Sequence, residues 1–77
     1  MKSTEYFRDN VIVTRLYVEL AWCARVLASP LRAEHQPLDG RWQMWGYIVE
    51  AERYLRVVTL EDRETVHNAF FDRRFKP

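Results

Sequence analysis

The sequence is poor in the residues that build disulfide scaffolds, metal centres and phosphate loops. Its single cysteine, Cys23, excludes an internal disulfide, which fits a reducing compartment. His35 and His67 are the only histidines, and no cysteine pair or carboxylate cluster has ligand spacing, so we expect no metal site and no cofactor. The two glycines form no phosphate-binding loop, and no Gly-x-Ser-x-Gly motif supports acyl chemistry.

Long apolar runs are also missing. The first five residues are polar and no extended apolar stretch follows, so we expect no signal peptide, no membrane span and a cytoplasmic location. The length of 77 residues indicates one domain over residues 1–77. Cys23 lies between Trp22 and Ala24 in a helical pattern, which favours a packed thiol over a nucleophile.

The chain is rich in aromatic rings and in arginine. Aromatic residues make up 14% of the chain, and ten of the twelve basic residues are arginine, although the net charge is only +1. The planar guanidinium suits phosphate and stacks on bases. An ordinary solvated surface is the alternative explanation for these arginines.

The apolar pattern predicts an α+β fold in the order ααββββ. A first short helix begins near Thr4 and contains Tyr6 and Phe7, although the β-branched run at residues 11–14 would also suit a strand. A second helix covers residues 17–28 and ends before Pro30. Strands are expected at residues 31–37, 41–49, 53–60 and 65–73. We therefore expect two N-terminal helices packed on one face of a four-stranded antiparallel sheet.

The turns decide which side chains share a face of this sheet. Asp39-Gly40 marks the first hairpin, and two-residue turns at 51–52 and 62–63 would follow. The last turn then places Val57 opposite Asn68, and a bulge or odd-length loop would reverse one strand. The predicted core face carries Trp42, Met44, Gly46, Ile48, Leu55, Val57, Thr59, Val66, Asn68 and Phe70. The predicted open face carries Arg41, Gln43, Trp45, Tyr47, Tyr54, Arg56, Val58, His67, Ala69, Phe71 and Arg73.

A sheet face that mixes rings with arginine suits single-stranded RNA, because rings stack on bases and arginine neutralises phosphates. RNA supplies its own nucleophile, the 2′-hydroxyl, so a protein need add only a base, an acid and positive charge. The candidate catalytic residues are His67, Arg56 and Arg73. The candidate binding residues are Arg41, Trp45, Tyr47, Tyr54, Phe71 and Arg74. A tyrosine hydroxyl, from Tyr47 or Tyr54, could relay a proton.

Each candidate has a plainer explanation. A lone strand histidine is more often a hydrogen-bonded or surface residue, and Arg73 and Arg74 could simply pair with Asp72 or Glu52. The exposed rings could be covered by a protein partner or by a second copy of the chain. Asn68, on the predicted core face, is expected to be a structural amide.

Several segments resemble a family of very small bacterial proteins that lie near the BrnT and RelE toxins, in the barnase–EndoU–colicin–RelE-like fold. The similar segments are Gly40-Arg41, 45–47, 53–58 and 65–73, with Arg15, Trp22 and Pro30 upstream. The resemblance implies a toxin that cleaves RNA, ribosome-bound mRNA included, without a metal ion, and a small antitoxin protein that covers the open face. Only Arg56, His67 and Arg73 match the catalytic positions of that family. Arg63 departs from it, because glycine is expected in this turn.

Two other classes of function remain open. A non-catalytic module could use the aromatic and basic face to bind a protein or RNA. A structural domain could instead bury its rings in a homodimer, whose stability would depend on concentration.

Overall fold

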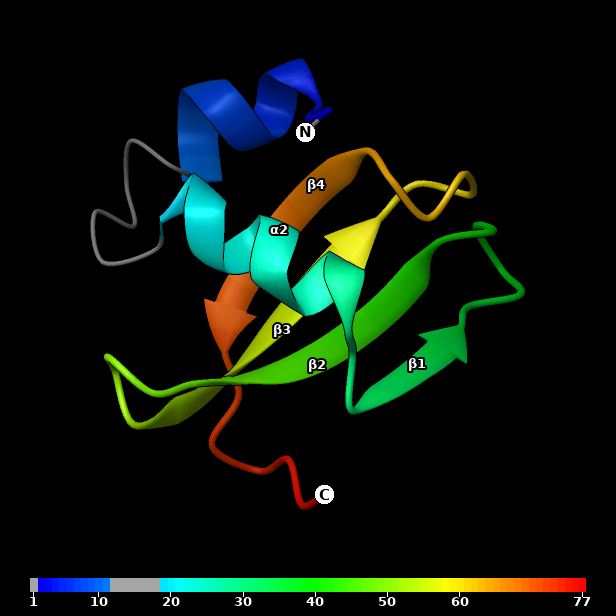
Figure 1. Ribbon diagram of the computed structural model, residues 1–77. Helices are drawn as coiled ribbons and strands as arrows, with labels where there is room; N and C mark the ends of the chain where they lie inside the picture. Colours follow the sequence, from blue (N-terminus) through cyan, green and yellow to red (C-terminus); the bar gives the residue numbers. More distant parts are fainter. Residues whose placement is uncertain (1, 12–18) are drawn as a thin grey trace.

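The structure, a computed structural model, describes residues 2–11 and 19–77. It is an α+β fold in which one helix covers one face of a four-stranded antiparallel sheet (Figure 1). The strands follow one another in the sheet as they do in the chain, β1-β2-β3-β4. The elements are η1 (Phe7–Val11), α2 (Leu20–Ala28), β1 (Arg32–His35), β2 (Trp42–Ile48), β3 (Arg53–Thr59) and β4 (Val66–Phe71).

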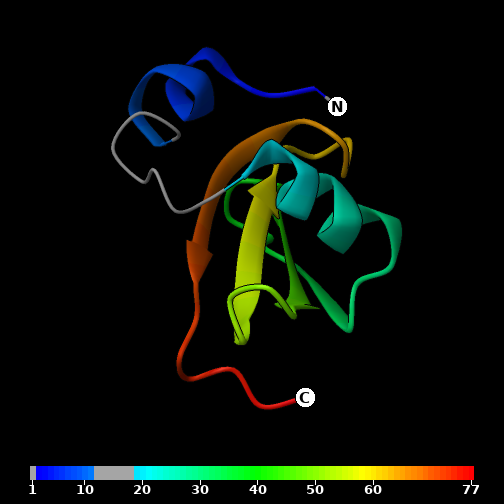
Figure 2. The same ribbon diagram turned by 60° about the vertical axis from the view of Figure 1, so that its left-hand side comes forward.

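The prediction of two N-terminal helices is wrong, because the described residues contain a single α-helix, α2. The first predicted helix is only the short π-helical segment η1, which lies above β4 in Figure 2. Ser3 forms a parallel bridge with Val66, so the chain before η1 is extended and tied to β4. The hydroxyl of Thr4 then accepts a hydrogen bond from the Phe7 amide at 3.1 Å, as an N-cap does. Part of each predicted helix, residues 12–18, lies outside the described residues.

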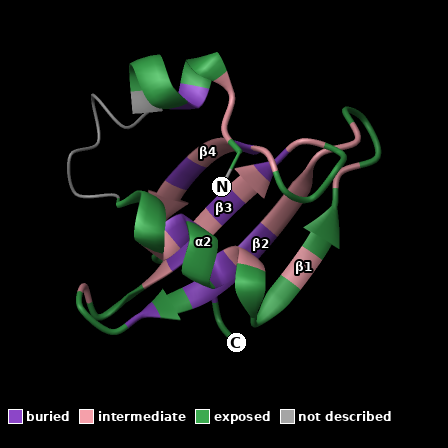
Figure 3. Cartoon of the chain, turned by 45° about the horizontal axis from the view of Figure 1, so that its top comes forward, coloured by how far each residue is buried: buried purple, intermediate pink, exposed green. Residues whose placement is uncertain are grey.

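Helix α2 lies over β2 and β3 and ends where Pro30 was expected to end it. Gly46 allows this close approach, because a Cβ at this position would lie 2.8 Å from the Cγ2 atom of Val26. Cys23 is buried at the same interface, as expected for a packed thiol. Figure 3 shows the buried residues gathered on the strands beneath α2. The core cluster consists of Phe7, Cys23, Val26, Met44, Ile48, Leu55, Val57, Val66 and Ala69.

The β2–β3 hairpin has the predicted faces but not the predicted register. Tyr47 lies opposite Tyr54, and Ile48 lies opposite Arg53. The turn therefore contains the four residues 49–52 rather than two, with Glu52 in the left-handed region at φ 53°. The register moves by two residues, an even number, so every side chain of this hairpin stays on its predicted face.

The β3–β4 hairpin has the opposite outcome. Val58 pairs with Asn68 but Thr59 pairs with Val66, so His67 is the extra residue of a β-bulge. Beyond the bulge the register is one residue from the predicted one. Asn68 and Phe70 therefore lie on the open face, and Ala69 and Phe71 on the core face, which corrects all four predicted positions.

The turn before β4 is wider than the two residues expected. Leu60 and Thr65 close it through a backbone hydrogen bond of 2.9 Å. Arg63, where glycine was expected, has a φ of 62°. The Asp62 carboxylate accepts hydrogen bonds from the backbone amides of Glu64 and Thr65, both at 2.9 Å. These bonds fix the turn in spite of the non-glycine residue in the left-handed region.

Candidate functional site

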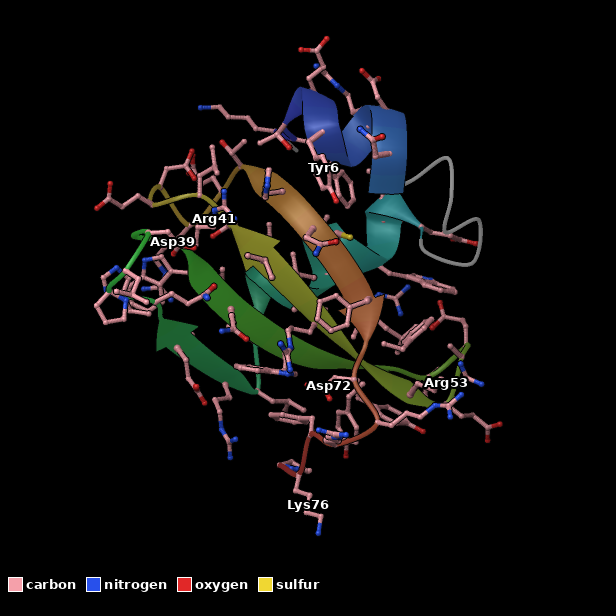
Figure 4. All side chains as sticks on the ribbon, turned by 180° about the vertical axis from the view of Figure 1, so that it is seen from behind. Tyr6, Asp39, Arg41, Arg53, Asp72 and Lys76 are labelled. Carbon is pink, nitrogen blue, oxygen red and sulfur yellow. The ribbon has the colours of Figure 1, made fainter. Side chains whose placement is uncertain are left out.

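A polar pocket of about 290 Å³ lies at one end of the open face, the sheet face opposite α2. Figure 4 views this face and shows Tyr6, Asp39 and Arg41 together at this end, with Asp72 and Lys76 at the other end. The pocket is formed by the segment that precedes η1, by the β1–β2 loop and by strands β2, β3 and β4. The pocket is lined by Tyr6, Gln36, Asp39, Arg41, Gln43, Arg56, Val58, His67 and Asn68.

The bulge places His67 in this pocket and the N-terminal segment fixes its ring. The Nδ1 atom lies 3.0 Å from the Thr4 hydroxyl, and the Tyr6 ring stacks on the imidazole at a centroid distance of 5.0 Å. With Nδ1 engaged by Thr4, Nε2 is the ring nitrogen left to meet a bound molecule. Partial burial and the nearby charge of Arg41 lower the pKa of His67 below its ordinary value of 6.5, while Asp39 opposes them. The imidazole is therefore neutral at neutral pH and able to accept a proton.

Arg56 lies between the pocket and the rest of the open face. Its guanidinium is 4.8 Å from the centre of the Phe70 ring and 5.3 Å from that of Trp45. Its Nε and Nη2 atoms donate to one carboxylate oxygen of Asp72 at 3.2 and 2.7 Å. Arg56 is thus held by two rings and a carboxylate, and Asp72 already offsets its charge.

Asp72 joins β4 to the aromatic part of this face. The same carboxylate oxygen accepts a hydrogen bond from the Trp45 indole at 2.9 Å, and the side chain is only 10% exposed. Burial alone would raise the pKa of Asp72, but the hydrogen bonds from Trp45 and Arg56 hold it at about 2. The carboxylate therefore stays charged and keeps both donors in place at neutral pH.

The aromatic candidates lie at the far end of the open face from the pocket. Trp45 is only 5% exposed, because the Phe75 ring stacks on it at 5.2 Å with an interplanar angle of 13°. Tyr54 packs beside Phe75 at 5.1 Å, and Tyr47, which is 44% exposed, meets Tyr54 edge-on. The rings expected to be open to solvent are thus partly covered by the chain itself.

The remaining three candidates, Phe71, Arg73 and Arg74, also lie away from the polar pocket. Phe71 is on the core face, 6.1 Å from Trp22, with the Arg53 guanidinium over its ring. Arg73 is exposed and lines a separate groove of about 280 Å³ with Tyr54 and Phe75. Arg74 is exposed beside it, and its backbone amide bonds Asp72. The structure therefore brings His67, Arg56 and Arg41 together but leaves Arg73 apart from them.

Sequence patterns gave no signal for several residues of the site. Tyr6 and Gln36 reach the pocket from segments outside the hairpins that the register argument covered. Asn68 was placed on the wrong face by the missed bulge. Asp72 was considered only as a partner of Arg73 and Arg74, whereas its carboxylate binds Arg56. A bulge predicted at His67 would have placed Asn68 on the open face, but it would not have indicated Tyr6, Gln36 or the role of Asp72.

The described residues contain neither a metal centre nor a reactive thiol. No three His, Cys, Asp or Glu side chains among residues 2–11 and 19–77 are placed to hold a metal ion. Burial raises the pKa of the Cys23 thiol to about 12, which leaves it protonated and unreactive. In the same part of the chain, no helix is long and apolar enough to cross a membrane.

Comparison with known proteins gives no assignment. No protein-family model matches the chain, and no curated protein or solved structure matches it either. The function must therefore be argued from the pocket and the face around it.

Proposed function

We propose that this protein is a toxin-like endoribonuclease that binds single-stranded RNA on the open sheet face and cleaves it at the polar pocket. The observation that carries the proposal is the placement of His67, a neutral imidazole fixed by Thr4 and Tyr6, in one pocket with Arg41. A base of this kind and a cation that meets the phosphate are the main requirements for cleavage of RNA through its own 2′-hydroxyl.

In the proposed reaction His67 is the tautomer whose Nδ1–H donates to the Thr4 hydroxyl, so Nε2 is unprotonated. Nε2 accepts the proton of the 2′-hydroxyl, whose oxygen attacks the adjacent phosphorus. Arg41 stabilises the extra negative charge that develops on the phosphate. Tyr6 is the tyrosine of the pocket, so it takes the relay role that the sequence suggested for Tyr47 or Tyr54. As the 2′ oxygen bonds to phosphorus, the bond from phosphorus to the 5′ oxygen breaks, and the leaving oxygen takes the proton that the Tyr6 hydroxyl relays from His67. The products are a 2′,3′-cyclic phosphate and a free 5′-hydroxyl.

The resemblance to BrnT- and RelE-like toxins supports the same proposal and adds a partner. We extend the proposal to a small antitoxin protein that covers the open face. We also propose that the protein acts in the cytoplasm, because its single cysteine is a free, buried thiol, as is usual in a reducing compartment. The exposed rings of Tyr6 and Tyr47 at the two ends of this face offer such a protein an apolar contact. A short antitoxin-like reading frame beside the gene would support the pair.

A non-catalytic RNA-binding module is the second candidate. The observation that favours it is the Arg56–Asp72 pair, which removes one of the two arginine charges from the pocket. Tight RNA binding by the pure protein, with long RNA left intact, would select this module over the nuclease.

The test compares His67→Ala with His35→Ala on a labelled single-stranded RNA. His35 is exposed on β1 against Trp42, so its replacement controls for the loss of a histidine elsewhere. Loss of the general base lowers cleavage by about 100-fold or more, while His35→Ala cleaves like the wild type. Cyclic phosphate ends and resistance of the matching DNA strand are also expected. Full activity of His67→Ala, with both variants folded by circular dichroism, would remove His67 from the reaction.

A further inference from the structure

On the open face, the Phe75 ring lies against three planar groups: the rings of Trp45 and Tyr54 and the guanidinium of Arg32. Trp45 lies against one part of it, nearly parallel at 13°, and the Arg32 guanidinium lies 5.0 Å from its centre. Tyr54 contacts it from β3 at a tilt of 58°. As a result Phe75 is 8% exposed, although Arg74 and Lys76 on either side are exposed. We call the space between Trp45, Tyr54 and Arg32 the stacking slot.

Besides this ring, the segment that carries Phe75 is held by a 3.0 Å hydrogen bond from the Arg74 amide to the Asp72 carboxylate and by two longer ones. The Phe75 amide approaches the Asp72 carbonyl at 3.5 Å, at the limit of a hydrogen bond, and Arg32 reaches the Lys76 carbonyl at 3.3 Å. Asp72, by contrast, continues the sheet through a 2.9 Å bond from its amide to the Tyr54 carbonyl, besides its carboxylate bonds. A turn after Asp72 would release Phe75 at the cost of the Arg74 bond, while Trp45 and Arg56 stay bound to the other oxygen of the Asp72 carboxylate.

We propose that the stacking slot is a nucleobase-binding subsite that Phe75 occupies in the free protein and leaves when single-stranded RNA binds. The inference rests on the proposed RNA binding, although not on cleavage. A base would take the position of the Phe75 ring, against the indole of Trp45 and about 5 Å from the guanidinium of Arg32. Stacking of bases on aromatic and arginine planes is how single strands are commonly held.

The charge around the slot favours a nucleotide over an aromatic side chain of a protein. Arg32 lies at the slot itself, 3.9 Å from Glu34, and Arg73 and Arg74 directly precede Phe75 in the sequence. Arg53 and Arg73 line the adjoining groove together with Glu52 and Asp72. A phosphate attached to a stacked base would meet these arginines, which an uncharged ring does not attract in the same way.

The slot and the polar pocket also suit one strand. Trp45 and Gln43 lie on the same face of β2, two residues apart, which separates them by about 7 Å along the strand. Arg56 contacts Trp45 and lines the pocket, so it joins the two sites. One RNA strand running along β2 and β3 can therefore place one base in the slot and a neighbouring phosphate beside His67.

The test measures binding of a labelled eight-residue oligoadenylate RNA by anisotropy, with every protein carrying His67→Ala so that no cleavage intervenes. Phe75→Ala empties the slot and should tighten binding about fivefold or more, because the free protein no longer holds the subsite closed. Phe75→Trp offers a larger stacking surface to Trp45 and should weaken binding. Leu38→Ala removes an exposed apolar side chain elsewhere and should change nothing. A strand of the same length with abasic sugars should lose the gain shown by Phe75→Ala.

The outcomes separate this inference from the nuclease proposal. Equal affinity of the His67→Ala parent and of its Phe75→Ala and Phe75→Trp derivatives would overturn the subsite. This holds even if all three bind RNA and the protein with His67 intact cleaves it. A gain that persists on the abasic strand would also overturn it, because a base would then play no part. Should Phe75→Ala fail to fold, Phe75→Trp decides alone, and unchanged affinity in that variant counts against the slot. Absence of RNA binding in all variants would instead remove the proposed function.

Discussion

The two ends of the open face differ in whether a side chain of the protein fills them. At the polar end, His67, Arg41 and the amides of Gln36, Gln43 and Asn68 surround a hollow. At the aromatic end, the stacking slot is filled by Phe75, and the Asp72 carboxylate satisfies both Trp45 and Arg56. The first end is built to meet another molecule directly, whereas the second must first give up a contact of its own.

The ionisable groups of the two ends follow the same division. The pKa of His67 is lowered from 6.5 mainly by partial burial, so the imidazole is neutral at neutral pH and can accept a proton. The pKa of Asp72 is held at about 2, so its charge is constant at any physiological pH. The polar end therefore holds a group that can exchange a proton, whereas the charged group of the aromatic end fixes its neighbours in place.

The largest expected effect is on stability, at the aromatic end. Asp72→Asn removes the charge that binds Arg56 and should lower the free energy of unfolding at pH 7 by about 2 kcal/mol, from a pKa of about 2 against an ordinary 3.8. Because the folded pKa is the lower one, this stability is present above pH 3.8 and is lost as the pH falls toward 2. Urea titrations of the wild type and the variant should therefore converge over that range. Asp9→Asn, an exposed carboxylate in η1, serves as the control. A difference that does not shrink in acid would contradict this account of the pair.

A smaller effect is expected at the polar end. Arg41→Ala should weaken RNA binding and cleavage about tenfold, since one charge-assisted contact to phosphate is worth about 1.4 kcal/mol. Arg25→Ala is the matched control, because Arg25 lies on α2 and bonds Glu50 at 2.7 Å, away from the open face. Melting temperatures should show that Arg41→Ala folds normally. Equal losses in both variants would mean that only overall charge matters.

The smallest effect concerns the titration of His67. Arg41→Ala should raise the His67 pKa toward 6.5, and Asp39→Asn should lower it further, because these two charges act on the imidazole in opposite directions. Both shifts are expected to be small, because solvent and salt screen the two charges in this partly exposed site. Proton NMR of the ring measures them without any assay of activity. Shifts of the same sign in both variants would show that the pocket differs from the one described.

The hairpins show what could and could not be predicted from the sequence. The β2–β3 faces were correct even though the turn was two residues too short, because an even error leaves every side chain on its own face. The β3–β4 faces were wrong for residues 68–71, because the single extra residue at His67 cannot be seen in a pattern of alternating polarity. His67 nevertheless reached the open face, by way of the bulge rather than by regular alternation.

The contacts that define the site depend on segments distant in the sequence. Thr4 and Tyr6 reach His67 from the opposite end of the chain, where the parallel bridge between Ser3 and Val66 ties their segment to β4. Phe75 covers Trp45 after a turn that no local pattern marks. The composition predicted that arginine and aromatic residues make up the open face. The contacts in the folded chain decide which of these side chains can bind another molecule.

The β-bulge at His67 has a consequence for finding relatives of this protein. Val66 and Ala69 both face the core, although Ala69 is the third residue after Val66 and not the second. The buried residues of β4 are therefore spaced by three at the bulge, whereas a regular strand spaces them by two. Loss of one residue here would restore strict alternation and move the imidazole away from Thr4. A search that requires alternating apolar positions through this strand would therefore miss proteins that keep the bulge, whereas one that allows Val-x-x-Ala would find them.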